Sequence, residues 1–479
     1  MRSFFILCLW TLCQATLLLA SRLEADDVAS APLVPALEPL SPSFKVTVGP
    51  TEVPVYLARV SNLTVEQRRS LGMPVSESTA ETSFSSFDLA GNSVVTVTCP
   101  SAIQTAKILP SSSGITPMVS GNQVAFSVSR PGALTLEVNG GWISSLELFV
   151  NPPETNIPKP DDPNVIYYGP GVHEVEPMEV GSGKTIYLAP GSVIYGKTKD
   201  GKPGNEIFRL TGSNITLRGR GIIDGSLCPR GSGSILGIYG CRNVQLEGII
   251  LRDSCGWTMP VRRCDQVKID NVKVFGWRGN SDGMDICNSR QVEVSDSFLR
   301  TFDDLIVIKS DKGQGESSDI TVRHCVLWNE FAHALSLGAE LREPVTNVRF
   351  TDCDIIHDKG REWLLRVYNC DSAAVKNVVF DDIRIEEARR LMSIWIGKTI
   401  WSKQPERGQV ENVSFQNITS VLPESPGPTV DLVGFDADHA VDHVGLEQVL
   451  IGGKPLVAAS IRQNEFVHHI DLVPLSQGP

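Results

Sequence analysis

The chain has 479 residues and a formal net charge of −12 at pH 7, with a sequence pI near 5.3. This acidic balance argues against a nucleic-acid-binding protein, which needs a basic surface to displace counterions from phosphates. Hydrophobic residues make up 41% of the chain and charged residues 20%, which excludes disorder throughout and allows two globular domains.

The first twenty residues, MRSFFILCLWTLCQATLLLA, combine one arginine, an apolar run and a final small residue. This pattern predicts a secretory signal peptide over residues 1–20, cleaved near Ala20 or Ala25. A transmembrane anchor is the alternative, but the run is short and Gln14 interrupts it. We therefore expect a secreted protein, extracellular or periplasmic, without membrane attachment after cleavage. Residues 21–43, rich in Pro and Ala, are expected to form a flexible lead-in.

Residues 44–152 contain short runs in which apolar and polar residues alternate. The runs are FKVTV, SVVTVTC, NQVAFSVS, ALTLEV and LELFV, and turn sequences such as SRPG and VNGG separate them. Alternation with a period of two is typical of half-buried strands, so this segment is predicted to be a small antiparallel β-sandwich. The Pro-rich stretch NPPETNIPKPDDPN then marks a boundary to a second domain over residues 162–475.

The second domain is built from a repeated unit. Its well-formed copies are NVQLEGIILRDS, QVKIDNVKVFGW, QVEVSDSFLRTF, DITVRHCVLWNE, NVRFTDCDIIHD and NVVFDDIRIEEA. Each has apolar or small residues in two alternating pairs with a change of phase between them, which predicts two short strands joined by a bend. One unit cannot bury its apolar row alone, so the units must stack into a right-handed parallel β-helix. A propeller would need longer periods, and a sandwich would show hairpin turns between most strands.

Nine cysteines remain after removal of the predicted signal peptide, and an odd number cannot pair completely. Most of them fall in strand-like patterns, where cysteine behaves as a small hydrophobic residue. We expect few disulfides or none. Cys325 and Cys353 share one position of the repeat and are expected to stack in the core, with a disulfide between them as the alternative.

Polar residues recur after the second strand of four consecutive units. They are Asp282, the pair Asp303 and Asp304, His333 and Arg366. Because equivalent positions in successive turns of a β-helix lie on one face about 4.8 Å apart, these side chains are predicted to form one patch. An isolated Asp commonly ends a strand, but three carboxylates in register with a His and an Arg favour a catalytic site. One protonated and one ionised carboxyl group are what glycosidic bond hydrolysis requires.

These motifs resemble those of glycoside hydrolase family 28, the polygalacturonases, over roughly residues 164–420. The family motifs NTD, DD, GHG and RIK have counterparts in Asn280-Ser281-Asp282, Asp303-Asp304, Ala332-His333-Ala334 and Arg366-Val367-Tyr368. The resemblance implies inverting hydrolysis of an α-linked polysaccharide, most directly pectin, with Asp303 as the general acid. Asp282 and Asp304 would hold and deprotonate the attacking water, His333 would orient the environment of the acid, and Arg366 would bind substrate. No metal or other cofactor is implied.

The chain departs from the family pattern at the substrate side. Tyr368 replaces a Lys that grips the galacturonate carboxylate in the family, and alanines replace both glycines beside the His. The loss of that Lys leaves the uronate substrate open, since a carboxylate needs a charged partner. The cations that could compensate are Lys309, Arg366, Arg361 and Arg252.

Four further residues are candidates for substrate binding beside Arg366 and Tyr368. Lys309 and Asn280 accompany the carboxylates in sequence, and Trp257 and Trp277 precede the Asp282 loop. Sugar rings stack on exposed indole faces, although packing over the corners of the coil is the alternative for either Trp.

The order of a sandwich, an NPPE sequence and a β-helix also resembles glycoside hydrolase family 49, the dextranases and isopullulanases. That resemblance implies a neutral α-glucan as an alternative substrate. A non-catalytic carbohydrate-binding β-helix and a polysaccharide lyase are further alternatives. In each case the expected partner is a polysaccharide, and we expect a monomer.

Overall fold

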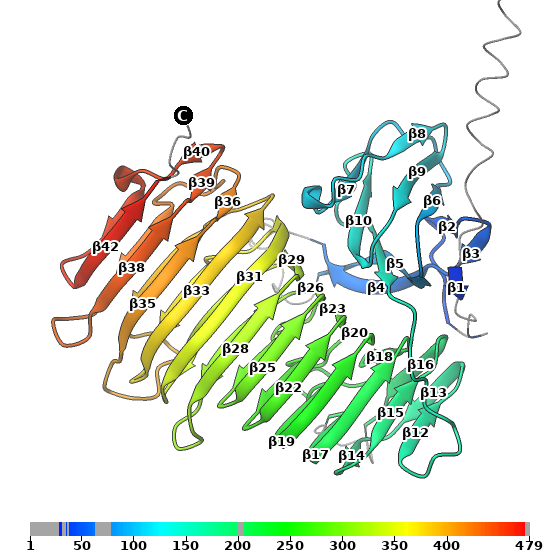
Figure 1. Cartoon of the computed structure of the whole chain (residues 1–479), viewed down its shortest axis with the longest axis horizontal. Helices are drawn as coiled ribbons and strands as arrows, with labels where there is room; N and C mark the ends of the chain where they lie inside the picture. The colour runs from blue at the N-terminus through cyan, green and yellow to red at the C-terminus, as the bar shows by residue number, and fades with distance from the viewer. Residues whose placement is uncertain (1–27, 31–34, 36–37, 63–77, 199–205, 475–479) are drawn as a thin grey trace, which may run out of the picture.

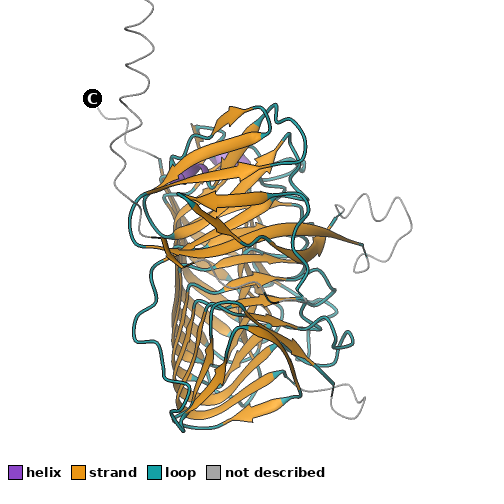
Figure 2. Cartoon of the chain, turned by 90° about the vertical axis from the view of Figure 1, so that its right-hand side faces the viewer, coloured by secondary structure: helices purple, strands orange, loops and turns teal. Residues whose placement is uncertain are grey.

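The computed structural model describes residues 28–30, 35, 38–62, 78–198 and 206–474. The predicted signal peptide, with Cys8 and Cys13, lies outside the described residues. Within the described ranges, no helix has the length and apolar character needed to cross a membrane. Strands make up nearly the whole fold, with loops at its corners (Figure 2).

Two sheets form the N-terminal unit. The first contains β1 (Val28–Ser30), β4 (Tyr56–Ser61), β5 (Thr79–Leu89), β7 (Ala106–Leu109), β10 (Gly132–Val138) and β11 (Leu146–Asn151). The second contains β2 (Lys45–Val48), β3 (Thr51–Val53), β6 (Ser93–Thr98), β8 (Met118–Ser120) and β9 (Gln123–Val128), and the short helix η1 (Ser111–Ser113) connects β7 to β8. Inward-facing residues of both sheets, such as Val95 and Leu148, share one buried cluster, as expected for a sandwich.

Two details of this unit differ from the sequence prediction. The strands β5 and β11 pair in parallel, whereas all other pairs of the two sheets are antiparallel. A parallel pair needs a long connection, and the intervening strands β6 to β10 supply it. The lead-in predicted to be flexible over residues 21–43 is partly ordered, because β1 pairs with β5 and the buried Glu38 carboxylate lies 2.5 Å from the Arg252 guanidinium.

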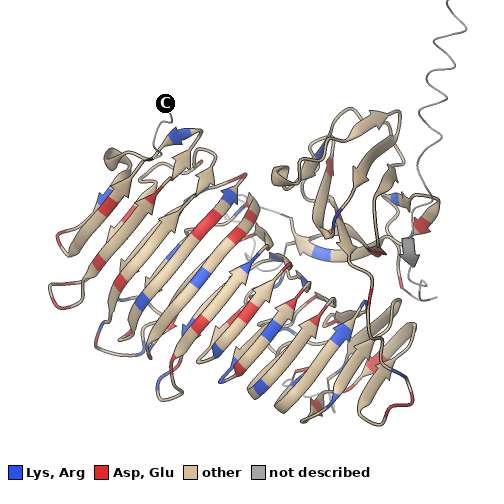
Figure 3. Ribbon diagram, in the orientation of Figure 1, with Lys and Arg blue, Asp and Glu red and all other residues tan. Residues whose placement is uncertain are grey.

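The second unit is a parallel β-helix with three strands in most turns, which confirms the fold predicted from the repeats (Figure 1). Face A contains β12 (Val165–Tyr168), β15 (Thr185–Leu188), β17 (Phe208–Gly219), β19 (Leu236–Glu247), β22 (Asp265–Asp270), β25 (Arg290–Ser295), β28 (Ser317–Arg323), β31 (Val345–Asp358), β33 (Ala374–Ile385), β35 (Gln409–Gln416), β38 (Val441–Glu447) and β42 (Val467–Val473). Acidic and basic residues are interspersed along these long strands (Figure 3).

The other two faces have shorter strands. Face B contains β13 (Gly171–Val175), β16 (Ser192–Gly196), β18 (Ile222–Asp224), β20 (Ile250–Arg252), β23 (Lys273–Phe275), β26 (Phe298–Thr301), β29 (Val326–Asn329), β36 (Thr419–Ser420) and β39 (Leu450–Ile451). Face C contains β14 (Met178–Val180), β21 (Met259–Arg262), β24 (Met284–Cys287), β27 (Ile306–Ser310), β30 (Leu335–Leu341), β32 (Leu365–Asn369), β34 (Met392–Ile396), β37 (Val430–Val433) and β41 (Ile461–Gln463). The hairpin strand β40 (Lys454–Pro455) and helix η3 (Ala458–Ser460) lie near the C-terminal end.

The repeat works as predicted because each apolar position stacks on its equivalent in the next turn. On face C, Met284, Ile306, Leu335, Leu365 and Met392 are paired in register and fully buried. The first residue of each unit has a left-handed backbone, with φ between 53° and 62° from Asn214 to His443. Asn and Asp tolerate this conformation better than β-branched residues, which explains why polar residues begin the units.

All nine cysteines in the described part of the chain are buried free thiols. Cys325 and Cys353 are fully buried in the core of the β-helix, at the stacked position that the repeat assigned to them. The burial of these thiols agrees with their apolar role in the repeat.

The sandwich packs against face B through buried aromatic residues and ion pairs. Phe84 and Phe149 of the sandwich lie 5.3 and 5.2 Å, centroid to centroid, from Phe275 and Phe298 of the β-helix. The fully buried Arg300 lies 3.1 Å from Glu147 and 2.9 Å from Glu330. These contacts hold the two units together.

Candidate active site

The three predicted aspartates and His333 lie at the corner where the chain enters face C. Asp282, Asp304 and His333 each stand two residues before a face C strand, namely β24, β27 and β30. The backbone N–H of Gly283 donates to the Asp304 carbonyl at 2.8 Å, and that of Leu305 donates to the His333 carbonyl at 2.9 Å. These bonds put the three residues in one column across adjacent turns.

The three aspartates meet at this corner. One carboxylate oxygen from each of Asp282, Asp303 and Asp304 lies within 4.8 Å of the other two. Asp282 is buried, with 3% of its surface exposed, whereas Asp303 and Asp304 are half-buried. The Asp303 carboxylate accepts hydrogen bonds from the backbone N–H groups of Asp304, at 3.1 Å, and of Asn280. These two bonds fix its orientation at the edge of the corner.

Burial of this cluster disfavours the charged forms of its carboxyl groups. Burial, together with the neighbouring carboxylate of Asp285, raises the pKa of Asp282 well above its usual range. Burial and Asp303 do the same to the pKa of Asp304, and burial raises the pKa of Asp303 itself. The cluster therefore retains a proton at a pH where isolated carboxyl groups are ionised.

Lys309 supplies the counter-charge from β27. Its ammonium lies 2.8 Å from Asp285, 3.3 Å from Asp282 and 3.8 Å from Glu340. Burial alone would lower the pKa of Lys309, but these carboxylates outweigh it and raise the pKa well above its usual value. The ammonium also lies 4.0 Å from the centre of the Trp257 ring. The Lys309 ammonium thus has all of these charge partners within the site.

Asp285 and Glu340 were missed by sequence reasoning. Asp285 lies between the core residues Met284 and Ile286, and a polar residue between two inward-facing residues of a strand must face outward. That alternation could have identified Asp285. Burial raises the pKa of Asp285 to about 6, although Lys309 opposes the shift.

His333 and Arg366 form the next part of the corner. The Arg366 guanidinium donates to His333 Nε2 at 3.3 Å and to the Glu362 carboxylate at 3.0 Å. Burial and the adjacent Arg366 and Lys309 lower the pKa of His333 well below its usual range, so the ring is neutral at neutral pH. Because a guanidinium can only donate, Nε2 accepts and Nδ1 carries the proton, 3.6 Å from the Asp304 carboxylate.

The remaining candidates divide into two groups. Tyr368 packs under the Arg366 guanidinium at 3.6 Å, and Trp257 lies against Lys309, so both belong to the site. Asn280 is exposed beside Asp303 with a left-handed φ of 62°. Trp277 instead donates to Asp253 and lies 5.2 Å from the Arg59 guanidinium of the sandwich. The structure therefore does not bring Trp277 to the carboxylates.

Arg252 and Arg361, two of the cations predicted to compensate for the missing Lys at position 368, already pair with carboxylates of the protein. Arg252 is buried under the sandwich, 2.5 Å from both Glu38 and Asp224, so it is not available to a substrate and that prediction is wrong. Arg361 is exposed but lies 3.3 Å from Glu362.

Two side-chain clusters among the described residues have the composition of a metal site. The three aspartates are one of them, and oxygen atoms of this kind suit a hard cation, but Lys309 already places a positive charge at the cluster. The other is Asp442, His443 and His469, where the two imidazoles stack at 4.7 Å and continue the left-handed positions that begin each unit.

A cavity of about 730 Å³ lies away from this corner. Residues 127–134 of the sandwich line it, together with Asp296, Asp352 and Arg384 of the β-helix. None of the predicted site residues lines this cavity, so it is separate from the carboxylate cluster.

Residues 180–440 match the family model of the glycosyl hydrolases family 28, and this range includes the three aspartates, His333 and Arg366. The chain belongs to this family. It is 24% identical over 230 residues to a probable polygalacturonase of Arabidopsis thaliana, covering 44% of this chain and 50% of that protein. It is 23% identical over 282 residues to a polygalacturonase of Juniperus ashei, covering 53% of this chain and 52% of that protein. The chain thus spans about half the length of these curated relatives.

Solved structures share the fold. An exopolygalacturonase from Thermotoga maritima superposes with a TM-score of 0.52 at 17% identity, covering 64% of this chain and 84% of that one. Dex49A from Penicillium minioluteum gives 0.59 at 14% identity, covering 92% of this chain and 96% of that one. The match to Dex49A covers more of this chain than the β-helix alone contains. The two folds therefore share the sandwich as well as the β-helix.

Proposed function

We propose that this family 28 chain is a secreted, inverting glycoside hydrolase that cleaves α-linked pectic polysaccharide, as a polygalacturonase does. The observation that carries the proposal is the meeting of three carboxylates from two turns, with an oxygen of each within 4.8 Å. Such a group shares protons unequally, so one carboxyl group donates a proton while another accepts one.

The positions of the three groups support different roles. Asp303 is half-buried and held by two backbone N–H groups, which supports the role of its carboxyl group as the acid that protonates the glycosidic oxygen. Asp282 is buried beside Lys309, and Asp304 lies beside the neutral His333 ring. Asp282 and Asp304 would position the attacking water and accept its proton. Arg366, Tyr368, Asn280 and Trp257 would contact the sugars around the cleaved bond.

The test compares the wild-type protein with Asp303→Asn on polygalacturonate, by release of reducing ends. We expect a loss of roughly 10²- to 10⁴-fold in kcat, the usual contribution of a general acid. The exposed Asp438 supplies a matched control, because Asp438→Asn removes the same charge far along the chain from the site. Undiminished turnover by Asp303→Asn would remove that residue from the acid role.

The stereochemical outcome needs its own measurement. Most inverting enzymes separate their carboxyl groups by roughly 6.5–9.5 Å, and the nearest oxygens here are closer. Inversion therefore depends on whether Asp282 and Asp304 hold water rather than attack the sugar. NMR of the first anomer released from an α-linked substrate decides this, with the β-anomer expected and the α-anomer contradicting the proposal.

Secretion, domain limits and oligomeric state are also proposals. A mature N-terminus at residue 21 or 26 would support the signal peptide over residues 1–20, and an uncut N-terminus would contradict it. Limited proteolysis between residues 152 and 162 tests the boundary between the units, and light scattering tests the monomer.

A neutral α-glucan is the second candidate substrate. Two observations favour it: the two-unit layout is shared with Dex49A, and the cations Lys309 and Arg366 are already paired with carboxylates. Turnover of dextran but not of polygalacturonate would select this alternative.

A further inference from the structure

A loop outside the cluster of three aspartates makes contacts to which none of the proposed catalytic roles assigns a purpose. Residues 397–408 connect β34 of face C to β35 of face A. The loop exposes two large apolar side chains, Ile400 at 84% and Trp401 at 49%. It also exposes Lys403.

Hydrogen bonds hold this loop in one conformation. The buried Asp371 carboxylate accepts the backbone N–H groups of Lys403 at 2.7 Å and of Gln404 at 2.9 Å. The Ser402 hydroxyl donates to the Cys370 carbonyl at 2.7 Å. At Gly408, an added Cβ would lie 1.8 Å from the Ala373 carbonyl oxygen, so the end of the loop fits closely against the preceding turn. A fixed loop that exposes apolar surface is typical of a preformed binding surface.

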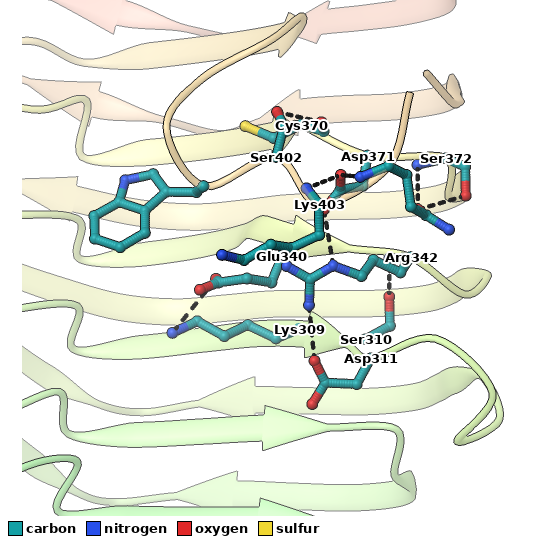
Figure 4. Close-up of polar contacts among 12 residues, drawn as sticks. Lys309, Ser310, Asp311, Glu340, Arg342, Cys370, Asp371, Ser372, Ser402 and Lys403 are labelled. Carbon is teal, nitrogen blue, oxygen red and sulfur yellow. Dashed lines mark hydrogen bonds and ion pairs between the residues drawn. The ribbon is translucent and has the colours of Figure 1, made fainter. Parts of the chain in front are cut away.

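The same carboxylate connects the loop to the site. Asp371 also accepts the Arg342 guanidinium at 2.9 Å, and Arg342 lies two residues after Glu340, a partner of Lys309. At the other edge of the loop, Thr399 hydrogen-bonds the side chain of Tyr368. Figure 4 shows the Lys403 side chain extending toward the side on which Lys309 and Glu340 lie.

Unlike Lys309, Arg366 and Arg342, Lys403 forms no ion pair with a carboxylate in the part of the chain that the structure describes. Lys309 has three carboxylates, Arg366 pairs with Glu362, and Arg342 pairs with Asp311 and Asp371. Across the described ranges, by contrast, no carboxylate lies within 4 Å of the Lys403 ammonium. An anionic sugar approaching face C would therefore meet Lys403 as an unshared positive charge.

We propose that Lys403 binds the carboxylate of a uronate unit of the polysaccharide and thereby sets the preference of this site for an anionic chain. The proposal deepens the proposed function and rests on it. The charge that Tyr368 cannot provide comes from the loop after the next face C strand, and the half-exposed Trp401 offers a stacking face for the same sugar. The ligand class is an α-linked oligouronide with free carboxylates.

Binding to the Asp303→Asn protein tests this without requiring turnover. Calorimetry would compare hexagalacturonate, its methyl ester and isomaltohexaose as probes. Lys403→Met should weaken binding of hexagalacturonate about tenfold and leave binding of the neutral ester unchanged. Lys376 on β33 of face A is the matched control, since Lys376→Met removes the same charge from an exposed pair with Glu411.

Each outcome decides the proposal. Equal affinity of the Lys403→Met and Lys376→Met proteins for hexagalacturonate would overturn it. So would equal weakening of the charged and esterified hexamers, because a charge–charge contact cannot act on the ester. If only isomaltohexaose binds, the uronate role of Lys403 is wrong, while the hydrolytic role of Asp303 is judged separately by the effect of Asp303→Asn on dextran turnover.

Discussion

Replacing Lys309 with Met removes the counter-charge of the carboxylate cluster and tests the electrostatic description of the site. In the wild-type protein the ammonium lies 2.8 Å from Asp285 and 3.3 Å from Asp282, and all three side chains are buried. Met preserves most of the side-chain volume, so the perturbation is the lost charge. Breaking a buried ion pair on one side costs about 3–5 kcal/mol when the remaining charge cannot be neutralised.

Protonation limits that cost at low pH. The pKa of Asp285 is about 6 in the folded protein, against about 4 in an unfolded chain. A carboxyl group whose folded pKa is raised contributes stability at low pH and loses it as the pH rises through the folded value. For Asp285 this amounts to about 3 kcal/mol, lost between about pH 4 and pH 6. Without Lys309 the pKa rises further, so the loss continues to higher pH.

We therefore expect the destabilisation by Lys309→Met to be about 1 kcal/mol near pH 5 and about 3–5 kcal/mol near pH 8. At roughly 2 °C per kcal/mol, the melting temperature falls by about 2 °C at the lower pH and by about 6–10 °C at the higher pH. Differential scanning fluorimetry at the two pH values measures this. The double variant Lys309→Met/Asp285→Asn serves as control and should recover much of the loss near pH 8. A loss that is independent of pH, or unaffected by Asp285→Asn, would refute the reasoning.

Three further predictions follow from individual contacts. Arg366→Met removes the cation 3.3 Å from the His333 ring, so the His333 pKa should rise toward its usual value, which NMR of the imidazole protons would follow against pH; an unchanged titration contradicts it. Arg300→Met should destabilise the protein by about 3–5 kcal/mol in urea unfolding, because it breaks two fully buried ion pairs, one to Glu147 of the sandwich and one to Glu330 of the β-helix; a change below about 1 kcal/mol would show that they contribute little. Gly408→Ala should displace the 397–408 loop from the Ala373 carbonyl and lower the free energy of unfolding by about 1–3 kcal/mol. It should also weaken hexagalacturonate binding, and unchanged binding would argue against a role of the loop.

The sequence by itself determined the β-helix and the meeting of the carboxylates. In a stacked coil, the position of a residue in the repeat becomes its position on a face, since each turn bonds to the next in register. Met284, Ile306 and Leu335 stack as the apolar pattern required, and Asp282, Asp304 and His333 align two residues before them. Both follow from the spacing of residues along the chain.

The contacts made by long side chains were decided only by the tertiary structure. Lys309 reaches across to Asp282, Asp285 and Glu340 on neighbouring strands, and no pattern along one strand specifies which of several carboxylates a flexible side chain will meet. Arg252 is buried because the sandwich docks on face B and brings Glu38 to it. The placement of Lys403 depends on an irregular loop held by Asp371 of the previous turn. Repetition encodes the register of the backbone, whereas docking of the two units and the course of irregular loops depend on contacts between segments far apart in the chain.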